Sequence, residues 1–357
     1  MPATTIDRLR RRIDRIDDRM LDLLAKRAQA AQAIGRAKAV DGRGVYVPAR
    51  EKRILDRLNR RRGQLPAPVV RAVFREVISA CRSLERGIRV AYLGPEATYS
   101  HMAAREQFGA GASFGPVESI PQVFENVERG DAEFGVVPIE TSTDGVVTHT
   151  LDRFLESNLR IAAEICLDVN HCLLSKHGDP RRVRRIFSHP QGLVQCRRWI
   201  AAHHPNASLH EMASTAAAAR EAAKHDGAAA VASALAAEVY GLEVLADHIQ
   251  DLSFNATRFV VIGLNDSAEP SGDDKTSAVF SIRDEVGILH HMLEPFAENK
   301  INLTRIESRP LKGRPWEYVF FLDFLGHHKE RRVARALARL DRSCQMLKVL
   351  GSYPVWR

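Results

Sequence analysis

Apolar positions near the start of the chain follow a helical repeat. They recur at steps of three, four and seven residues, at Ile13, Met20, Leu24, Ala31 and Ile34. No Pro or Gly interrupts residues 3–34, so the pattern predicts a single helix of about thirty residues. Gly42 and Gly44 then break the pattern, and prolines mark the start of two further helices. Their predicted ranges are 48–58 and 69–84.

The middle of the chain, 88–265, alternates short apolar runs with helical stretches. The β-type runs are 89–93, 134–139, 185–187 and 228–231, and the helical stretches are 100–107, 191–202, 215–225 and 234–240. This alternation predicts an α/β fold, and the length of the segment suggests two lobes with a ligand in the cleft between them.

The last segment follows a linker rich in Ser, Pro, Gly and Asp at 266–274. Its pattern predicts strand 277–282, helix 287–299, strands 302–308 and 316–324, helix 329–340 and strand 345–350. The resulting βαββαβ order is that of a ferredoxin-like α+β domain.

Composition supports a multidomain globular protein. The chain has 357 residues, of which 45% are hydrophobic and 27% charged, which suits two or three domains. No apolar run is long enough to cross a bilayer, and the charged start favours a cytoplasmic location. The five cysteines are scattered and lack C-x-x-C spacing, so we expect reduced thiols, with no disulfide, no metal and no cofactor.

The formal charge of +8 belongs to the first quarter of the chain, where 23 Lys/Arg face 10 Asp/Glu within residues 1–90. Such a basic helical block suits nucleic acid, an acidic membrane surface or anionic small molecules. Continuing the stripe from Leu24 brings in Arg27 and Lys38. Cationic side chains at core-facing positions must pair with anions, because burying an unpaired charge is costly. The alternative is that their long side chains reach outward from the edge of the stripe into solvent. This position favours a small anion over nucleic acid or a membrane.

Spacing along the helix separates these cations into two groups. Arg27 and Lys38 are 11 residues apart, about 16 Å and nearly in phase, so two long side chains can grip one ligand. Arg10 lies about 25 Å before Arg27 and is rotated by about 100°. It cannot serve the same pocket within one chain, and we expect it to reach into a partner's site.

A second candidate site lies where Asp251–Phe259 precedes the apolar run at 260–262. A hydroxyl and a guanidinium, Thr257 and Arg258, stand at the mouth of a predicted strand, where α/β sheets bind ligands. The alternative is that Asn255 and Thr257 are turn residues and that Arg258 is a solvated surface charge. The turn before the helix at 100–107 offers backbone N–H groups to an anion.

The first quarter resembles the all-helical chorismate mutase domain. The similar stretches are Leu9-Arg10, Arg27, Gly35-Arg36-Ala37-Lys38, Tyr46-Val47-Pro48-Ala49-Arg50-Glu51 and Phe74-Arg75-Glu76-Val77-Ile78. The resemblance implies an intertwined homodimer in which an arginine of the long helix crosses to the partner's pocket. The implied reaction is a Claisen rearrangement, which needs a folded substrate and placed charge instead of a nucleophile.

The same resemblance assigns roles to the residues. Arg10, Arg27 and Arg50 would bind the two carboxylates of chorismate, Lys38 and Glu85 the ether oxygen, and Glu51 the ring hydroxyl. Cys81, four residues before Glu85 and on the same face, belongs to this group. Val47 stands where some members have an acidic residue, and Glu85 stands where some members have Gln. Glutamate can donate to the ether oxygen only when protonated.

The middle segment is similar, in order and spacing of motifs, to prephenate dehydratase. The motifs are Gly94 to Ser100, Val137 to Gly145, Ser188-His189-Pro190-Gln191, Ser214-Thr215-Ala216, Tyr240-Gly241-Leu242 and the Asn255 to Phe259 stretch. The resemblance implies that Thr257 donates a hydrogen bond to the leaving hydroxyl, Arg258 anchors a carboxylate and Phe259 shapes the ring pocket. His189 is the competing proton donor.

Further residues of these motifs are implied to bind the substrate. They are Thr98, Ser100, Glu140, Thr141, Ser142, Ser188, His189, Gln191, Ser214, Thr215 and Asn255. The family commonly has Asn where this chain has Thr141, so an enzyme that prefers arogenate stays open. Two-lobed folds of the periplasmic-binding-protein type also serve non-catalytic receptors, so a small-carboxylate-binding regulatory protein is the other alternative.

The last segment resembles the ACT regulatory domain. The matching motifs are Gly287-Ile288-Leu289 and Glu307-Ser308-Arg309-Pro310, and the resemblance implies phenylalanine as an allosteric inhibitor bound there at a dimer interface. Ile288 replaces the usual Ala. The alternative is a domain that only dimerises.

Together these resemblances predict a bifunctional enzyme that converts chorismate to prephenate and then to phenylpyruvate. The expected domains are 1–87, 88–265 and 275–357. We expect a homodimer or homotetramer that binds neither nucleic acid nor membrane.

Overall fold

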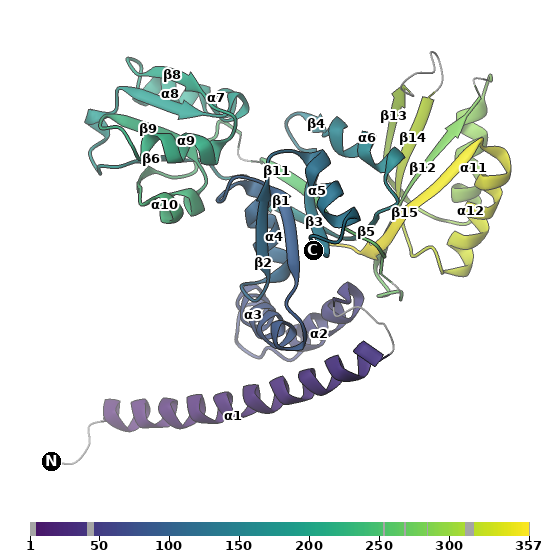
Figure 1. Ribbon diagram of the computed structural model, residues 1–357, viewed down its shortest axis with the longest axis horizontal. Coiled ribbons are helices and arrows are strands. Elements are labelled where there is room, and N and C mark those ends of the chain that lie inside the picture. Colours follow the sequence, from purple (N-terminus) through teal and green to yellow (C-terminus); the bar gives the residue numbers. More distant parts are fainter. Residues whose placement is uncertain are drawn as a thin grey trace. The chain divides into compact units, whose positions relative to one another are not determined.

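The computed structural model describes residues 5–40, 46–252, 254–267, 269–283, 285–310 and 318–356 (Figure 1). The break predicted at Gly42 and Gly44, and the start of the strand predicted at 316, lie outside these residues. The chain divides into two compact units. The first comprises Met1–Ile88 and Phe108–Ser113, and the second Arg89–Gln107 and Phe114–Arg357. No helix in the described part is both long and apolar enough to span a bilayer.

The first unit contains the three predicted helices. They are α1 (Thr5–Val40), α2 (Pro48–Arg60) and α3 (Ala67–Glu85). Pro48 occupies the first turn of α2, where its missing N–H costs no hydrogen bond. Along the first twenty residues of α1 the large apolar side chains are exposed, at Ile6, Leu9, Ile13, Ile16 and Met20. The apolar stripe of this half of α1 therefore has no cover within the chain's described residues.

The first lobe of the second unit is built on a mixed sheet in the order β2-β1-β3-β11-β5, with β4 beside β3. Its strands are β1 (Arg89–Leu93), β2 (Ser113–Val117), β3 (Phe134–Thr141), β4 (Gly145–Val146), β5 (Arg160–Asp168) and β11 (Ala256–Gly263). Its helices are α4 (Tyr99–Phe108), α5 (Ile120–Glu128) and α6 (Thr148–Glu156). Phe124, Phe154 and Ile161 are fully buried in its core.

The second lobe carries a sheet in the order β10-β6-β9-β7-β8. Its elements are β6 (Cys172–Ser175), a 3-10 turn η1 (Pro180–Arg182), β7 (Arg185–Ser188), α7 (Pro190–Gln195), α8 (Arg197–His203), β8 (Ser208–Glu211), α9 (Thr215–Ala222), β9 (Ala228–Ala232), α10 (Ala234–Tyr240) and β10 (Glu243–Ala246). The helix predicted over 191–202 is two helices. The Asp251 carboxylate accepts hydrogen bonds from the backbone N–H groups of Arg198 and Trp199 and so caps a new start at α8.

The last domain has the predicted βαββαβ order, with a sheet in the order β13-β14-β12-β15. Its elements are β12 (Asp274–Ile282), α11 (Ile288–Glu298), β13 (Leu303–Pro310), β14 (Tyr318–Leu325), α12 (Arg331–Ser343) and β15 (Met346–Pro354). The two helices cover one face of this sheet (Figure 1). On the opposite face of the sheet, side chains from three strands pack into the core of the first lobe, among them Val279 of β12, Phe321 of β14 and Tyr353 of β15. Gly351 touches β5 so closely that a Cβ would collide with the backbone of Ile161.

Candidate functional site

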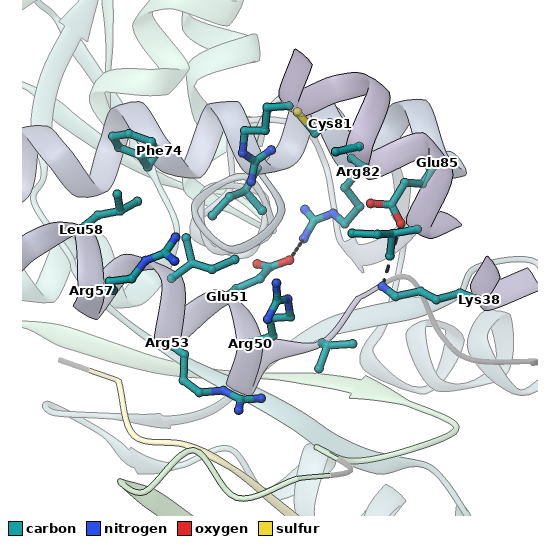
Figure 2. Close-up of a pocket in the computed structure, with 17 residues that line it drawn as sticks. Lys38, Arg50, Glu51, Arg53, Arg57, Leu58, Phe74, Cys81, Arg82 and Glu85 are labelled. Atoms are coloured by element: carbon teal, nitrogen blue, oxygen red, sulfur yellow. Dashed lines mark hydrogen bonds and ion pairs between the residues drawn. The ribbon is translucent and has the colours of Figure 1, made fainter. Parts of the chain in front are cut away.

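The first cavity lies within the helical unit and has a volume of about 660 Å³ (Figure 2). It is lined by six of the residues predicted for the mutase site: Arg27, Lys38, Arg50, Glu51, Cys81 and Glu85. Arg10 is exposed on α1 and does not line it. Arg27 and Lys38, on the stripe of α1, therefore line this cavity of their own chain, whereas Arg10 does not.

Lysines and arginines dominate the charge of this cavity. The six basic lining residues are Arg27, Lys38, Arg50, Arg53, Arg57 and Arg82, against the carboxylates of Glu51 and Glu85. Sequence reasoning missed Arg53, Arg57 and Arg82. The first two follow Arg50 at helical steps of three and seven, which is a signal that places them on one face of α2. The excess of positive charge suits a small dianion.

Arg82 holds one of the predicted site residues. Its Nη1 donates a 2.6 Å hydrogen bond to Oε1 of Glu51 (Figure 2). Its Nη2 donates one of 2.6 Å to the carbonyl of Phe108. The buried guanidinium also lies over the rings of Tyr46 and Phe108. Burial raises the pKa of Glu51 above its ordinary value, and neighbouring cations, chiefly Arg82, offset part of the rise.

Glu85 lies near Lys38, with 3.9 Å between Oε2 and Nζ. Burial raises the pKa of Glu85, while Lys38, Arg82 and Arg27 lower it in part. Its Oε2 is buried and accepts no hydrogen bond from the described residues. A carboxyl group in this setting takes up a proton more readily than one in water.

The second cavity, of about 1190 Å³, lies between the two lobes of the second unit. Of the residues predicted for the dehydratase site, ten line it: Thr98, Ser100, Thr141, His189, Gln191, Ser214, Thr215, Asn255, Thr257 and Phe259. Thr257 and Phe259 are two apart on β11, so they share a face of the strand. Thr257 is opposite Thr141 in the register with β3.

The structure corrects the role predicted for Arg258. Strand alternation turns its side chain to the face opposite Thr257, and it does not line the cavity. The guanidinium instead donates to Glu164 (2.9 Å), Asp323 (2.5 Å) and the Tyr353 hydroxyl (3.0 Å). Arg258 is neither a substrate anchor in this arrangement nor a solvated surface charge.

Three other predicted contacts also lie outside the cavity lining. Ser142 is exposed and its Oγ accepts from the N–H of Ala256, while Ser188 is buried and donates to the carbonyl of Val231. Glu140 lies 3.6 Å from Arg258, on the same side of the sheet. Each of these three side chains contacts another strand of the frame instead of lining the cavity.

Arg220 is one of the residues that sequence reasoning missed here. Among the described lining residues it is the only Lys or Arg. It follows Ala217, another lining residue, by three positions on α9, so the two share a helix face. The helix begins at Thr215, and the Ser214 hydroxyl caps it by accepting from the N–H of Ala217. The positive end of α9 and Arg220 thus offer a carboxylate two favourable partners.

A hydrogen-bond network joins the lobes at the cavity wall. Oε1 of Gln195 accepts from Asn255 (3.0 Å) and lies 2.8 Å from Nε2 of His171, while its amide donates to Thr143. Gln195 and His171 were not predicted, although Gln195 follows Gln191 by one helical turn. Burial lowers the pKa of His171 and of His189, which favours neutral imidazoles.

The residues predicted to bind an effector separate in the structure. Gly287 has φ of 78° and precedes α11, which begins at Ile288. On β13, Ser308 pairs with Phe320 on the helix-covered face, whereas Glu307 pairs with Phe321 on the face toward the first lobe. Arg309 lies on the Glu307 face and pairs with Asp152 of α6 at 3.1 Å. Leu289 packs against the helix-covered core, and Ser308 and Pro310 lie on that face of β13, while Glu307 and Arg309 lie on the face toward the first lobe.

The fold and cavities define a class of multidomain enzyme, with a cation-lined helical unit ahead of a two-lobed α/β unit that carries a small ferredoxin-like domain. Three family descriptions match in order along the chain: chorismate mutase type II over 9–86, prephenate dehydratase over 90–267 and ACT domain over 276–342. The bifunctional chorismate mutase/prephenate dehydratase of Aquifex aeolicus is 46% identical, covering 97% of each chain. The chain belongs to the bifunctional chorismate mutase/prephenate dehydratase family.

Solved structures resemble the second and third parts of the chain. Prephenate dehydratase from Arthrobacter aurescens, in complex with L-Phe, has a TM-score of 0.69 and 36% identity over 75% of this chain and 90% of that one. A structure titled as GqqA, a novel type of quorum quenching acylase, has a TM-score of 0.69 and 31% identity over 75% of this chain and 98% of that one.

Proposed function

We propose that the chain rearranges chorismate to prephenate in the first cavity and converts prephenate to phenylpyruvate, by loss of carbon dioxide and water, in the second. The observation that carries the proposal is the placement of the motif residues of each activity around a separate cavity. Incubating the purified chain with chorismate tests it, because prephenate and then phenylpyruvate must accumulate. Binding of chorismate without turnover would favour a non-catalytic receptor instead.

In the mutase cavity the cations replace acid–base chemistry. Arg27 and Arg50 bind the carboxylates of chorismate and hold the substrate folded, so that the reacting ends meet. Lys38 and a protonated Glu85 place hydrogen bonds against the ether oxygen, where negative charge develops in the transition state. Glu51, fixed by Arg82, accepts from the ring hydroxyl.

A second copy of the chain completes this cavity with Arg10. The exposed apolar positions on the first half of α1, at Ile6, Leu9, Ile13 and Met20, support a homodimer because they need cover. Arg10 lies on the same half of the helix and does not line the mutase cavity of its own chain. Pairing of dimers into a tetramer is the further step that a sedimentation experiment would detect.

In the dehydratase cavity the driving force is aromatisation, so the enzyme has to hold the carboxylates and help hydroxide leave. Thr257 donates to the leaving hydroxyl, and the buried ring of Phe259 packs beside the forming aromatic ring. Arg220 and the N-terminus of α9 bind a carboxylate, the role first assigned to Arg258. Thr98, Ser100, Gln191 and Asn255 supply further polar contacts.

One finer point of specificity follows from the lining. Thr141 offers a shorter polar group than the amide common in the family, which leaves room for the amino analogue arogenate. Turnover of both substrates by one preparation measures this preference.

The ACT domain supplies regulation by phenylalanine. Gly287, Ile288 and Leu289 at the start of α11, together with Ser308 and Pro310 on β13, form the proposed effector contacts. Equilibrium dialysis against labelled phenylalanine tests this role, because a domain that only dimerises would retain none.

A further inference from the structure

We propose that Asp323, on the regulatory sheet, is a positioning residue for the dehydratase, acting through Arg258 on the strand that carries Thr257. The inference deepens the proposed dehydratase function and rests on it. It makes β14 part of the frame of the active site, so that the ACT domain contributes to turnover even when no effector is bound.

The contact between the two residues is short and buried. Nη1 of Arg258 lies 2.5 Å from Oδ2 of Asp323, and the two side chains are 11% and 4% exposed. Asp323 is held from its other side by the Ser277 hydroxyl, which donates to Oδ1 at 2.5 Å. The Tyr353 hydroxyl lies 2.6 Å from that of Ser277 and accepts from Arg258 at 3.0 Å. Strands β12, β14 and β15 thus all contribute to fixing one guanidinium.

Charges around this contact balance. The basic residues are Arg258, Arg305 and Lys275, and the carboxylates are Glu140, Glu164 and Asp323. Burial disfavours the charged form of Asp323, but Arg258, Arg305 and Ser277 outweigh it and hold its pKa below the ordinary value. Removing the charge of Asp323 therefore leaves an excess of buried positive charge around Arg258.

Arg258 directly follows Thr257, whose side chain lines the cavity. Arg258 and Thr257 are neighbours on β11, and they pair with Glu140 and Thr141 of β3. The register between β11 and β3 shifts immediately after Arg258, whereas the pairing with β5 on the other edge stays regular there, so ladder hydrogen bonds hold this stretch less regularly on the β3 edge. A guanidinium fixed by Asp323 compensates for this, because it fixes the backbone that aims the Thr257 hydroxyl into the cavity.

Three variants of the full-length chain test the inference. Asp323→Asn keeps the shape but removes the charge, and Tyr353→Phe removes one neutral partner of Arg258 while leaving every charge in place. Lys348→Met is the matched control. It removes a different contact between the same two domains, in which Nζ of Lys348 donates to the carbonyls of Phe154 and Ser157 and not to any partner of Arg258. The mutase activity of each variant serves as an internal standard.

We expect Asp323→Asn to lower dehydratase kcat at least about tenfold while the KM for prephenate changes by less than about threefold, because misplacing a catalytic group by a fraction of an ångström is costly. Tyr353→Phe should lower kcat by about threefold. Lys348→Met should leave kcat within about twofold, and mutase turnover should stay constant throughout.

Equal losses of dehydratase kcat in Asp323→Asn and Lys348→Met would overturn the inference. The interface would then contribute only by holding the two domains together, and not through Arg258. Unchanged kcat in both Asp323→Asn and Tyr353→Phe would overturn it too. If Asp323→Asn fails to fold, Tyr353→Phe decides the outcome alone. A wild-type chain without prephenate turnover would instead remove the proposed dehydratase function, which is a separate result.

Discussion

Arg82 and Glu51 form a 2.6 Å ion pair on the wall of the first cavity, between helices α3 and α2. The carboxylate expected to accept from the ring hydroxyl of chorismate is thus already oriented by a buried cation. Because Arg82 also donates to the carbonyl of Phe108, its guanidinium cannot turn to follow the substrate without losing that bond.

We predict that Arg82→Met lowers mutase kcat/KM by about 10- to 100-fold, because an unpaired Glu51 loses its orientation and takes up a proton. Removing one partner of a buried pair should also lower the free energy of unfolding by about 3 kcal/mol. Steady-state kinetics and chemical denaturation measure the two effects. Lys52→Met, which removes the cation of an i, i+4 pair with Asp56 on α2, is the control and should change neither by much.

The mutase should lose activity as pH rises. Burial raises the pKa of Glu85, and only the protonated carboxyl group can donate to the ether oxygen. The active form is therefore present below the raised pKa and is lost as pH increases through it. In Glu85→Gln the amide donates at every pH, so kcat/KM for chorismate should become flat across this range. A variant with the same slope as the wild type would show that Glu85 is not the donor.

Replacing Thr257 should separate the two candidate proton donors of the dehydratase. We expect Thr257→Ala to lower dehydratase kcat by about 10² or more and Thr257→Ser to retain most of it, with mutase activity unchanged in both. His189→Asn should cost less. If histidine were the donor, activity would rise as pH falls through its lowered pKa, and His189→Asn would abolish that rise.

Arg220 should control affinity for prephenate. Arg220→Met is expected to raise KM by about tenfold or more, because the cavity loses the cation that pairs with a carboxylate, while Arg220→Lys should keep part of the affinity. Lys224→Met is the matched control. It removes a surface cation near the end of α9 that pairs with Glu221. Equal KM values for Arg220→Met and Lys224→Met would exclude Arg220 from binding.

Mixing two inactive variants tests the origin of Arg10. If Arg10 comes from the partner and Arg27 from the same chain, a heterodimer of Arg10→Ala and Arg27→Ala chains holds one intact site. Random exchange of subunits should then restore about a quarter of wild-type mutase activity. No restoration after exchange, with dimers present by sedimentation, would place both arginines in one chain's site or leave Arg10 without a role.

Periodicity predicted the three helices of the first unit and the element order of the last domain, but in the two lobes it missed α5, α6 and several strands, β5, β6 and β8 among them. Strand β8 (Ser208–Glu211) is exposed at every position, so no apolar alternation marks it and only its pairing with β7 makes it a strand. The break at Cys196 was missed for a related reason. The capping carboxylate of Asp251 lies more than fifty residues further along the chain, beyond the reach of a local pattern.

The sequence by itself determined the three-part order, the helical stripe that carries Arg27 and Lys38, and the motifs around Thr257, because each depends on the repeat of neighbouring residues. Tertiary structure alone decided that Arg258 binds Asp323 and Glu164, that Arg82 holds Glu51, and that Arg220 is the cation of the second cavity. The physical reason is that backbone geometry sets which residues share a face, whereas the partner of that face is chosen by packing between segments far apart in the chain.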